Sequence, residues 1–320
     1  MLLSILIIRG YNTLDYDFPP YRPPNEANSA LIRASRGCPW NRCLFCTMYK
    51  TLKFQLKSVE EIKKDIDKAA KIYRYANTIF IADSDSLVMK DIDEIIKHIK
   101  LRFPGVERIT SYARAKTLLK LGLDKLKKIK KAGLTRVHVG LESGDAQTLD
   151  FLKKGSTPEE MIEGGKAAKN AGLEFSFYVL IGAGGKKRLK EHAMESARVC
   201  NEANPDFIRL RTLVVQHGSL LEEKMKSGSY KPTTPVEKLQ EVKIFLENLE
   251  VDKCELASDH FTNYIWIDNQ IVYRGIYGIL PDDKKEMLDI INQTLDLLSI
   301  TDGEILDATI LYDRGMIHNL

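Results

Sequence analysis

The sequence predicts an α/β fold, an incomplete (β/α)6 barrel of the TIM type that is followed by an α-rich C-terminal extension. Strand-like apolar segments and amphipathic helical segments alternate six times, with a period of about 25 to 35 residues. Two of the helical patterns stop at a glycine, Gly133 and Gly172, as helix C-caps commonly do. Such alternation implies parallel strands joined by right-handed crossovers, and six repeats are too few to close an eight-stranded barrel.

The elements of the barrel can be placed in order along the chain. Strands are predicted at residues 30–35, 78–82, 108–113, 135–142, 174–181 and 207–214. Helices are predicted at residues 59–75, 91–102, 118–132, 158–171 and 189–203. Ser58 and Glu61 have the spacing of a capping box at the start of the first helix. Polar or glycine-rich turns follow the strands, at the end where active sites of such barrels lie.

The pattern changes near Pro235. Helices are predicted at residues 236–249 and 281–298, with an aromatic-rich irregular stretch at 255–273 between them. We therefore divide the chain into an N-terminal extension (1–29), a barrel core (30–234) and a C-terminal extension that covers the barrel (235–320). The apolar opening, residues 1–8, is expected to be a packed strand or helical turn.

Composition limits the possible partners and the compartment. The chain has 320 residues, and 48 basic against 44 acidic residues leave a net charge of +4. This small, dispersed surplus does not favour a dedicated nucleic-acid binder, and no apolar run is long enough to span a membrane. Three of the five cysteines fall within nine residues, which argues against a disulfide framework. We expect a cytoplasmic protein without a membrane or nucleic-acid partner.

The three clustered cysteines are Cys38, Cys43 and Cys46, with four and then two residues between them. Three thiolates at this spacing can bind three irons of a cubane cluster and leave the fourth iron open. Structural zinc sites use four ligands, and electron-transfer clusters use four cysteines. A noncatalytic iron–sulfur or zinc protein remains an alternative, with Cys200 or Cys254 as the nearest further cysteine.

These residues resemble the radical S-adenosylmethionine (SAM) superfamily. The usual motif there has three residues in the first gap and an aromatic residue before the last cysteine, here Phe45. The resemblance covers about residues 30–215; beyond it, the segments 82–87, 140–144 and 259–264 are weakly similar to a poorly characterised subgroup. It implies a 4Fe–4S cluster whose open iron binds SAM, reductive formation of a 5′-deoxyadenosyl radical, and a reducing partner such as a ferredoxin or flavodoxin.

The resemblance also implies contacts with SAM. The turn after the second strand holds the methionine ammonium in this superfamily, and here it contains Asp83, Ser84 and Asp85. Glu142 corresponds to a residue that contacts ribose or methionine, and Ser111 is a candidate contact for the same ligand. Ile181 and Gly182 are expected to back the adenine, with Phe45 at its edge. No residue is assigned to the reaction with the substrate itself.

Strand alternation suggests where a substrate binds. It points Arg209 and Arg211 into the barrel, where each needs a carboxylate partner, either Glu142 or an anionic ligand. Further candidate contacts are Tyr112, His138, Tyr178 and His260. The sequence thus favours a radical SAM enzyme acting on a small, anionic organic molecule, with modification of RNA or a protein as the alternative.

Overall fold

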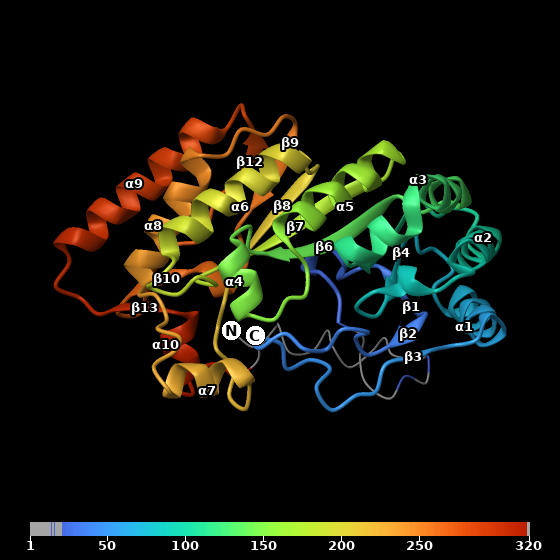
Figure 1. The fold of residues 1–320 in the computed structure, drawn as a ribbon, viewed down its shortest axis with the longest axis horizontal. Helices are drawn as coiled ribbons and strands as arrows, with labels where there is room; N and C mark the ends of the chain where they lie inside the picture. Colours follow the sequence, from blue (N-terminus) through green and yellow to red (C-terminus); the bar gives the residue numbers. More distant parts are fainter. Residues whose placement is uncertain (1–13, 15, 17–20, 319–320) are drawn as a thin grey trace.

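The computed structural model describes residues 14, 16 and 21–318, and its centre is one eight-stranded sheet (Figure 1). The prediction for residues 1–8 lies outside the described residues. The strand order is β1-β4-β5-β6-β7-β8-β9-β12, in which the first seven strands are parallel and β12 is antiparallel. The strands are β1 (Ala30–Arg33), β4 (Thr78–Ala82), β5 (Arg108–Ala113), β6 (Arg136–Glu142), β7 (Glu174–Ile181), β8 (Phe207–Thr212), β9 (Cys254–Ala257) and β12 (Tyr277–Leu280). β1 and β12 are the two edges in the described sheet, so the barrel is open as predicted.

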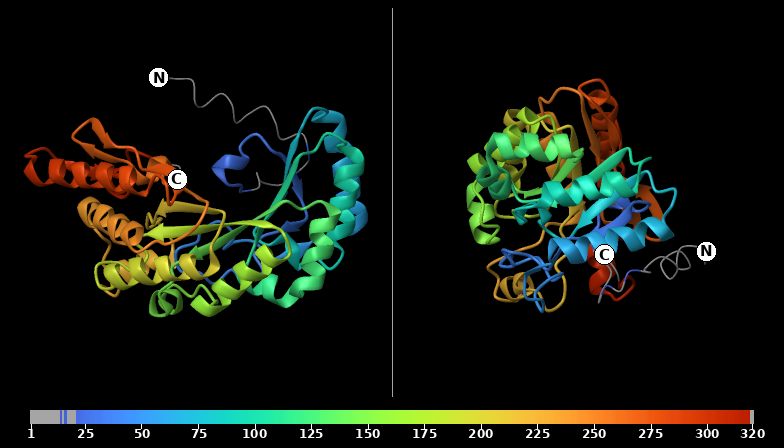
Figure 2. Two further views of the ribbon diagram at one scale, coloured as in Figure 1. Left: turned by 90° about the horizontal axis from the view of Figure 1, so that it is seen from above. Right: turned by 90° about the vertical axis from the view of Figure 1, so that its right-hand side faces the viewer.

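The main helices lie along the convex side of the curved sheet (Figure 2). They are α1 (Val59–Ile72), α2 (Ile92–Arg102), α3 (Ala115–Ala132), α5 (Pro158–Asn170), α6 (Leu189–Ala203) and α8 (Pro235–Glu247). The six predicted β/α repeats are confirmed, and the capping box of Ser58 and Glu61 is present at the start of α1. Gly133 ends α3 with a φ of 129°, a conformation that an L side chain rarely adopts.

The two faces of the sheet differ in character. The outer face is apolar, and its side chains form one core with the helices, including Ile32, Ile79, Phe175, Phe177 and Ile208. On the inner face, four rings follow one another with centroids 5.1–6.2 Å apart: Phe80, Tyr112, His138 and Tyr178. The hydrophobic effect therefore fixes the outer face and leaves the inner face to polar and aromatic groups.

The C-terminal extension also contributes strands. Residues 255–273 were predicted to be irregular, which is wrong: they contain most of β9, the 3-10 turn η3 (Phe261–Asn263), β10 (Ile265–Ile267) and β11 (Gln270–Tyr273). β10 lies between β11 and β13 (Ile305–Asp307) in a second sheet. Strands of three or four residues are too short to show a periodicity in the sequence.

Other short elements complete the chain. Besides α9 (Lys284–Ile300), which corresponds to the predicted last helix, the structure has α4 (Ala146–Phe151), α7 (Leu220–Lys226) and α10 (Ala308–Asp313). The turn η1 (Pro24–Glu26) precedes β1, η2 (Ser86–Val88) follows β4, and β2 (Ser35–Arg36) pairs with β3 (Gln55–Leu56). Within residues 21–318, every helix is too short or too polar to cross a lipid bilayer.

Candidate active site

The cysteine loop, residues 37–54, connects β2 to β3 and is hydrogen-bonded to the short helices α4 and α7. Leu44, inside the motif, donates its N–H to the Leu152 carbonyl at 3.0 Å and accepts a hydrogen bond from the N–H of Leu221 at 3.0 Å. The indole of Trp40 donates to the Lys153 carbonyl at 2.7 Å. These hydrogen bonds hold the loop on both sides of Cys43 and leave the three thiols only partly buried.

The chemistry of the three thiols fits an iron–sulfur cluster. Burial raises the pKa of Cys43 to about 11, and the neighbouring Cys46 and Cys38 act in the same direction, so a bound metal is what would hold the thiolate form. In the described part of the chain, no three His, Cys, Asp or Glu side chains converge on the position of a single ion. A cubane does not need such convergence, because each thiolate binds a different iron. Cys200 and Cys254 are buried in the main core and are not available as a fourth ligand.

The turn after β4 is hydrogen-bonded to the start of the cysteine loop. The Asp83 carboxylate accepts a hydrogen bond from the Gly37 N–H at 3.2 Å, and it lies 3.6 Å from the Arg33 guanidinium. The Ser84 hydroxyl donates to the Gly37 carbonyl at 2.9 Å. Both predicted residues are therefore next to Cys38, where they position the loop.

Asp85 is the third predicted residue of this turn. It is fully buried, and one carboxyl oxygen accepts a hydrogen bond from the Thr117 hydroxyl at 2.5 Å. Its other oxygen has no hydrogen-bond partner among the described residues. Burial raises the pKa of Asp85 to about 7, against a weaker opposing effect of Thr117 and Arg114.

Glu142 is paired with a lysine that the sequence did not single out. Its carboxylate lies 2.7 Å from the Lys154 ammonium, and both groups act electrostatically on Cys43. Glu142 has a φ of 63°, just after an irregularity in the pairing of β6 with β7. The expectation that Glu142 could neutralise the inward arginines is therefore wrong, since Lys154 occupies it.

Of the four remaining predicted SAM contacts, two have side chains on the helix side of the sheet, and the other two lie in loops. The Ser111 hydroxyl bonds to the carbonyls of Ile81 and Tyr112, and Ile181 packs into the core under α8, so both side chains lie on the helix side. Phe45 packs in a second apolar cluster together with Ala183, next to Gly182. The structure thus brings Phe45 and the Gly182 turn together, and it separates the side chains of Ser111 and Ile181 from them.

A buried hydrogen-bond network holds the Gly182 turn in place. The Gly182 N–H donates to the Glu241 carboxylate at 2.7 Å, and its carbonyl accepts a hydrogen bond from the Tyr230 hydroxyl at 2.7 Å. His192 lies 3.2 Å from the same Glu241 carboxylate and 2.7 Å from the Ser143 hydroxyl. The turns after β6 and β7 are therefore linked through one histidine, which the sequence analysis did not include.

His138 and Tyr112 occupy the barrel interior. His138 is 3.3 Å from the buried Glu26 carboxylate of η1 and 2.9 Å from the Ser176 hydroxyl. Burial lowers the pKa of His138 and raises that of Tyr112. Because both ring nitrogens of His138 have protein partners, its position is that of a structural histidine within the barrel.

A cavity of about 240 Å³ lies beside the two inward arginines. It is lined by Pro24, Asn25, Tyr178, Arg209, Arg211 and Asp259. Arg209 is paired with Glu255 of β9 at 2.7 Å, whereas no carboxylate of the described residues lies within 4.0 Å of Arg211. The buried Tyr178 hydroxyl has no hydrogen-bond partner among the described residues, and the Arg211 guanidinium lies 5.9 Å from the centre of the Tyr178 ring.

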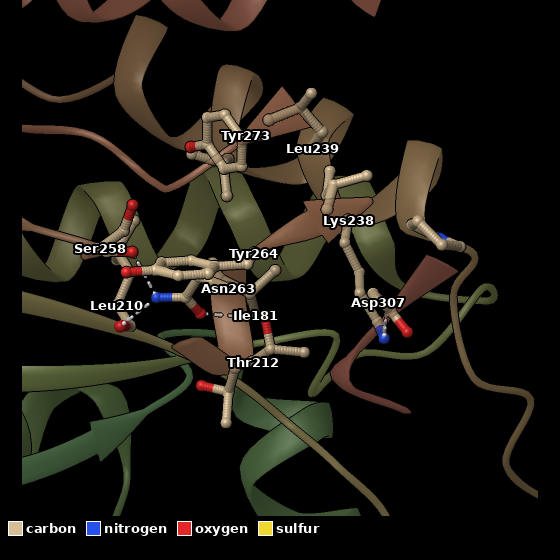
Figure 3. Close-up of a pocket in the computed structure, with 14 residues that line it drawn as sticks. Ile181, Leu210, Thr212, Lys238, Leu239, Ser258, Asn263, Tyr264, Tyr273 and Asp307 are labelled. Carbon is tan, nitrogen blue, oxygen red and sulfur yellow. Dashed lines mark hydrogen bonds and ion pairs between the residues drawn. The ribbon is translucent and has the colours of Figure 1, made fainter. Parts of the chain in front are cut away.

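The segment that carries His260 is fastened to the end of β8. The Asn263 amide donates to the carbonyls of Leu210 and Ser258 at 2.9 and 2.8 Å and accepts from the Thr212 hydroxyl at 3.0 Å (Figure 3). His260 bonds to the Thr262 hydroxyl at 2.8 Å, and burial, followed by the charge of Arg211, lowers its pKa to about 4. A neutral His260 thus lies within electrostatic reach of Arg211.

Comparison with known proteins adds a family assignment. The model of the family described as the radical SAM superfamily matches residues 32–195, about half of the chain and all of the cysteine loop. The chain belongs to the radical SAM superfamily. Members of this superfamily use a 4Fe–4S cluster and SAM, which agrees with the donor set of the cysteine loop.

Several relatives are similar over part of this radical SAM chain. It is 28% identical to a biotin synthase from Methanococcus maripaludis over 241 residues, covering 70% of this chain and 68% of that protein. It is 29% identical over 156 residues to an uncharacterized methyltransferase from Pyrococcus horikoshii and 30% identical over 112 residues to a tRNA uridine(34) acetyltransferase from Methanocaldococcus jannaschii. Those matches cover 48% and 35% of this chain but only 32% and 21% of the relatives.

The fold is also found among solved structures. The archaeal Elp3 of Methanocaldococcus infernus has a TM-score of 0.50 at 14% identity, covering 80% of this chain and 64% of that one. This likeness, with the eight-stranded sheet, confirms the predicted fold class.

Proposed function

We propose that this radical SAM protein cleaves SAM reductively and abstracts a hydrogen atom from a small, anionic organic substrate. When bound, the cluster supplies the electron that converts SAM into methionine and a 5′-deoxyadenosyl radical. Cys38, Cys43 and Cys46 are its proposed ligands, and Asp83 and Ser84 hold the loop that carries them. The support is the family assignment together with three thiols in one anchored loop.

The proposed SAM contacts are the predicted residues at the ends of β4, β6 and β7 and in the cysteine loop. We assign the ammonium end of SAM to the turn that contains Asp85, whose second carboxyl oxygen lacks a partner among the described residues. Glu142, Gly182 and Phe45 are the proposed contacts with the nucleoside. Ser111 and Ile181 are left out because their side chains lie on the helix side.

The anionic character of the substrate rests on Arg211. A partly buried guanidinium without a carboxylate partner is costly, and an anionic ligand removes that cost. Arg209 does not serve this purpose, since Glu255 already neutralises it. Arg211 and the Tyr178 hydroxyl, both at the 240 Å³ cavity, are therefore the proposed anion contacts.

SAM cleavage provides the test of the proposed function. The anaerobically reconstituted protein is reduced with dithionite in the presence of SAM, and methionine and 5′-deoxyadenosine are quantified. We expect the two products in equal amounts, and none from a Cys43→Ser variant. Intact SAM after incubation of a fully loaded, reduced protein would contradict the proposal.

Modification of tRNA is a second candidate, because two relatives are tRNA uridine(34) acetyltransferases. On α3, Lys120, Lys127 and Lys131 have no acidic partner within 4.0 Å among the described residues, so they are available to a phosphate backbone. Binding of unmodified tRNA is measured at 50 and 200 mM salt. Affinity that falls steeply with salt and is reduced by charge reversal on α3 would favour this candidate over a small substrate.

The reducing partner is proposed to be an acidic electron carrier. Between Arg36 and Lys57 the chain contains basic but no acidic residues, and this segment includes all three cysteines. Lys53 and Lys153 are exposed, flank Gly37 and Trp40, and have no acidic partner within 4.0 Å among the described residues. Charge complementarity with a flavodoxin or ferredoxin would speed their encounter at low ionic strength.

A further inference from the structure

The cavity beside β8 holds two opposite charges that the described protein does not pair. Arg211 has no carboxylate within 4.0 Å, and Asp259, which also lines the cavity, has no cation within 4.0 Å, among the residues described. The two groups are nevertheless within electrostatic reach: burial lowers the pKa of Arg211, and the Asp259 carboxylate acts in the opposite direction. Both side chains line the same cavity, and they do not form an ion pair across it.

The surroundings give each charge a different role. The Arg211 guanidinium lies 5.9 Å from the centre of the Tyr178 ring. The Tyr178 hydroxyl is buried without a hydrogen-bond partner among the described residues, so it is a donor suited to an oxygen acceptor. Arg209 adds no net charge, because Glu255 pairs with it. The lining of this one cavity thus offers a cation, a hydroxyl donor and a carboxylate.

We infer that this cavity binds a zwitterion of the α-amino-acid class, with its carboxylate on Arg211 and Tyr178 and its ammonium on Asp259. The inference rests on the proposed function and narrows its substrate class. A volume of about 240 Å³ lies just below the roughly 300–1,000 Å³ of typical small-molecule sites, which suits a molecule of amino-acid size. A ligand with only a carboxylate would leave Asp259 without a partner.

Two candidate ligands of this protein carry such a zwitterion: a free amino acid, and SAM at its methionine end. The position of Asp259 favours the free amino acid, because the segment 259–264 is fastened to β8, whereas the turn proposed for the SAM ammonium follows β4. Those strands are separated in the sheet by β5, β6 and β7. Binding measured with and without saturating SAM distinguishes the two.

The test is calorimetric and does not depend on turnover. Cluster-loaded protein is screened with the twenty standard L-amino acids, and each binder is compared with its N-acetyl derivative, which lacks the positive charge, and its primary amide, which lacks the negative charge. We expect each derivative to bind about tenfold or more weakly than the free amino acid. Arg211→Gln should lose the preference for the free acid over the amide, and Asp259→Asn the preference over the N-acetyl derivative.

Matched controls carry the same charge changes elsewhere. Arg74→Gln, just after α1, and Asp124→Asn, on α3, both at exposed positions, should leave both preferences unchanged. Equal binding of a free amino acid and its N-acetyl derivative would overturn the inference, as would loss of amino-acid binding when SAM is saturating. Failure to form 5′-deoxyadenosine while the charge preferences persist would instead refute the proposed function alone.

Discussion

Lys238 and Asp307 form a buried ion pair that ties α8 to the C-terminal β13–α10 unit (Figure 3). The Lys238 ammonium lies 2.6 Å from the Asp307 carboxylate and 2.6 Å from the Thr309 hydroxyl, and the two charged side chains are 7% and 4% exposed. Asp307 also caps α10 by accepting hydrogen bonds from the N–H groups of Thr309 and Ile310 at 3.0 and 3.1 Å. If one partner is removed, the remaining group keeps a different number of hydrogen bonds: Asp307 keeps two, and Lys238 keeps one.

This difference determines how much unfolding free energy each variant is expected to lose. Removing one partner of a buried pair typically costs about 3–5 kcal/mol. In Lys238→Met the Asp307 carboxylate keeps two backbone donors, so we expect a loss near the lower limit, about 3 kcal/mol. In Asp307→Ala the ammonium keeps only the Thr309 hydroxyl, so we expect a loss of about 4 kcal/mol from the broken pair. The lost cap of α10 adds about 1 kcal/mol, for a total of about 5 kcal/mol.

The assay is urea unfolding followed by circular dichroism, combined with hydrogen exchange of the amides of α10. We expect Asp307→Ala to be less stable than Lys238→Met by about 1–2 kcal/mol and the double variant to lose less than the sum of the two, since the pair can be broken only once. Additive losses, or a Lys238→Met variant that is the less stable of the two, would refute this reasoning.

Three further predictions concern the cysteine loop and its surroundings. Cys43→Ser should lower the iron content of reconstituted protein by more than half, measured against Cys200→Ser, whose sulfur lies in the core. Burial raises the pKa of Asp85 to about 7, so the folded state binds a proton more tightly than the unfolded state between pH 4 and 7, and stability falls as pH rises through this range. Asp85→Asn should remove that fall, up to about 1.4 kcal/mol per pH unit, and an unchanged profile of unfolding free energy against pH would contradict the assignment. Lys53→Glu/Lys153→Glu should slow cluster reduction by an acidic flavodoxin about tenfold at 50 mM salt while leaving reduction by dithionite unchanged, with Lys127→Glu/Lys131→Glu as the control of equal charge; equal slowing by both pairs would exclude a local docking surface.

The sequence predicted what depends on local pattern. The six strands and five helices of the core have strong periodicity and clear ends, so their positions agree with the structure to within a few residues. Alternation along β8 also predicted the opposite directions of Arg209 and Ile208, because a strand has a strict period of two. The three clustered cysteines predicted a cluster with an open iron, and the resemblance of their motif predicted the superfamily, which is confirmed.

The partners of the site residues could not be predicted in the same way. Lys154 pairs with Glu142, Glu255 with Arg209, and Glu26 with His138, which lies 112 residues away in the chain. Such pairs depend on which loops meet in space, and neither propensity nor periodicity records that. Ser111 and Ile181 were expected near SAM but lie on the helix side, because the alternation of β5 and β7 points them the same way as Ile109 and Val179.

We propose that Cys38, Cys43 and Cys46 hold a cluster with one iron open to SAM. Electron paramagnetic resonance of the anaerobically reconstituted and reduced protein tests it most directly, with spectra recorded before and after SAM is added. We predict a reduced 4Fe–4S signal whose g-values shift on addition of SAM. We predict no such shift when 5′-deoxyadenosine, which lacks the methionine part of SAM, is added instead. A reduced cluster whose spectrum is the same with and without SAM would contradict the account.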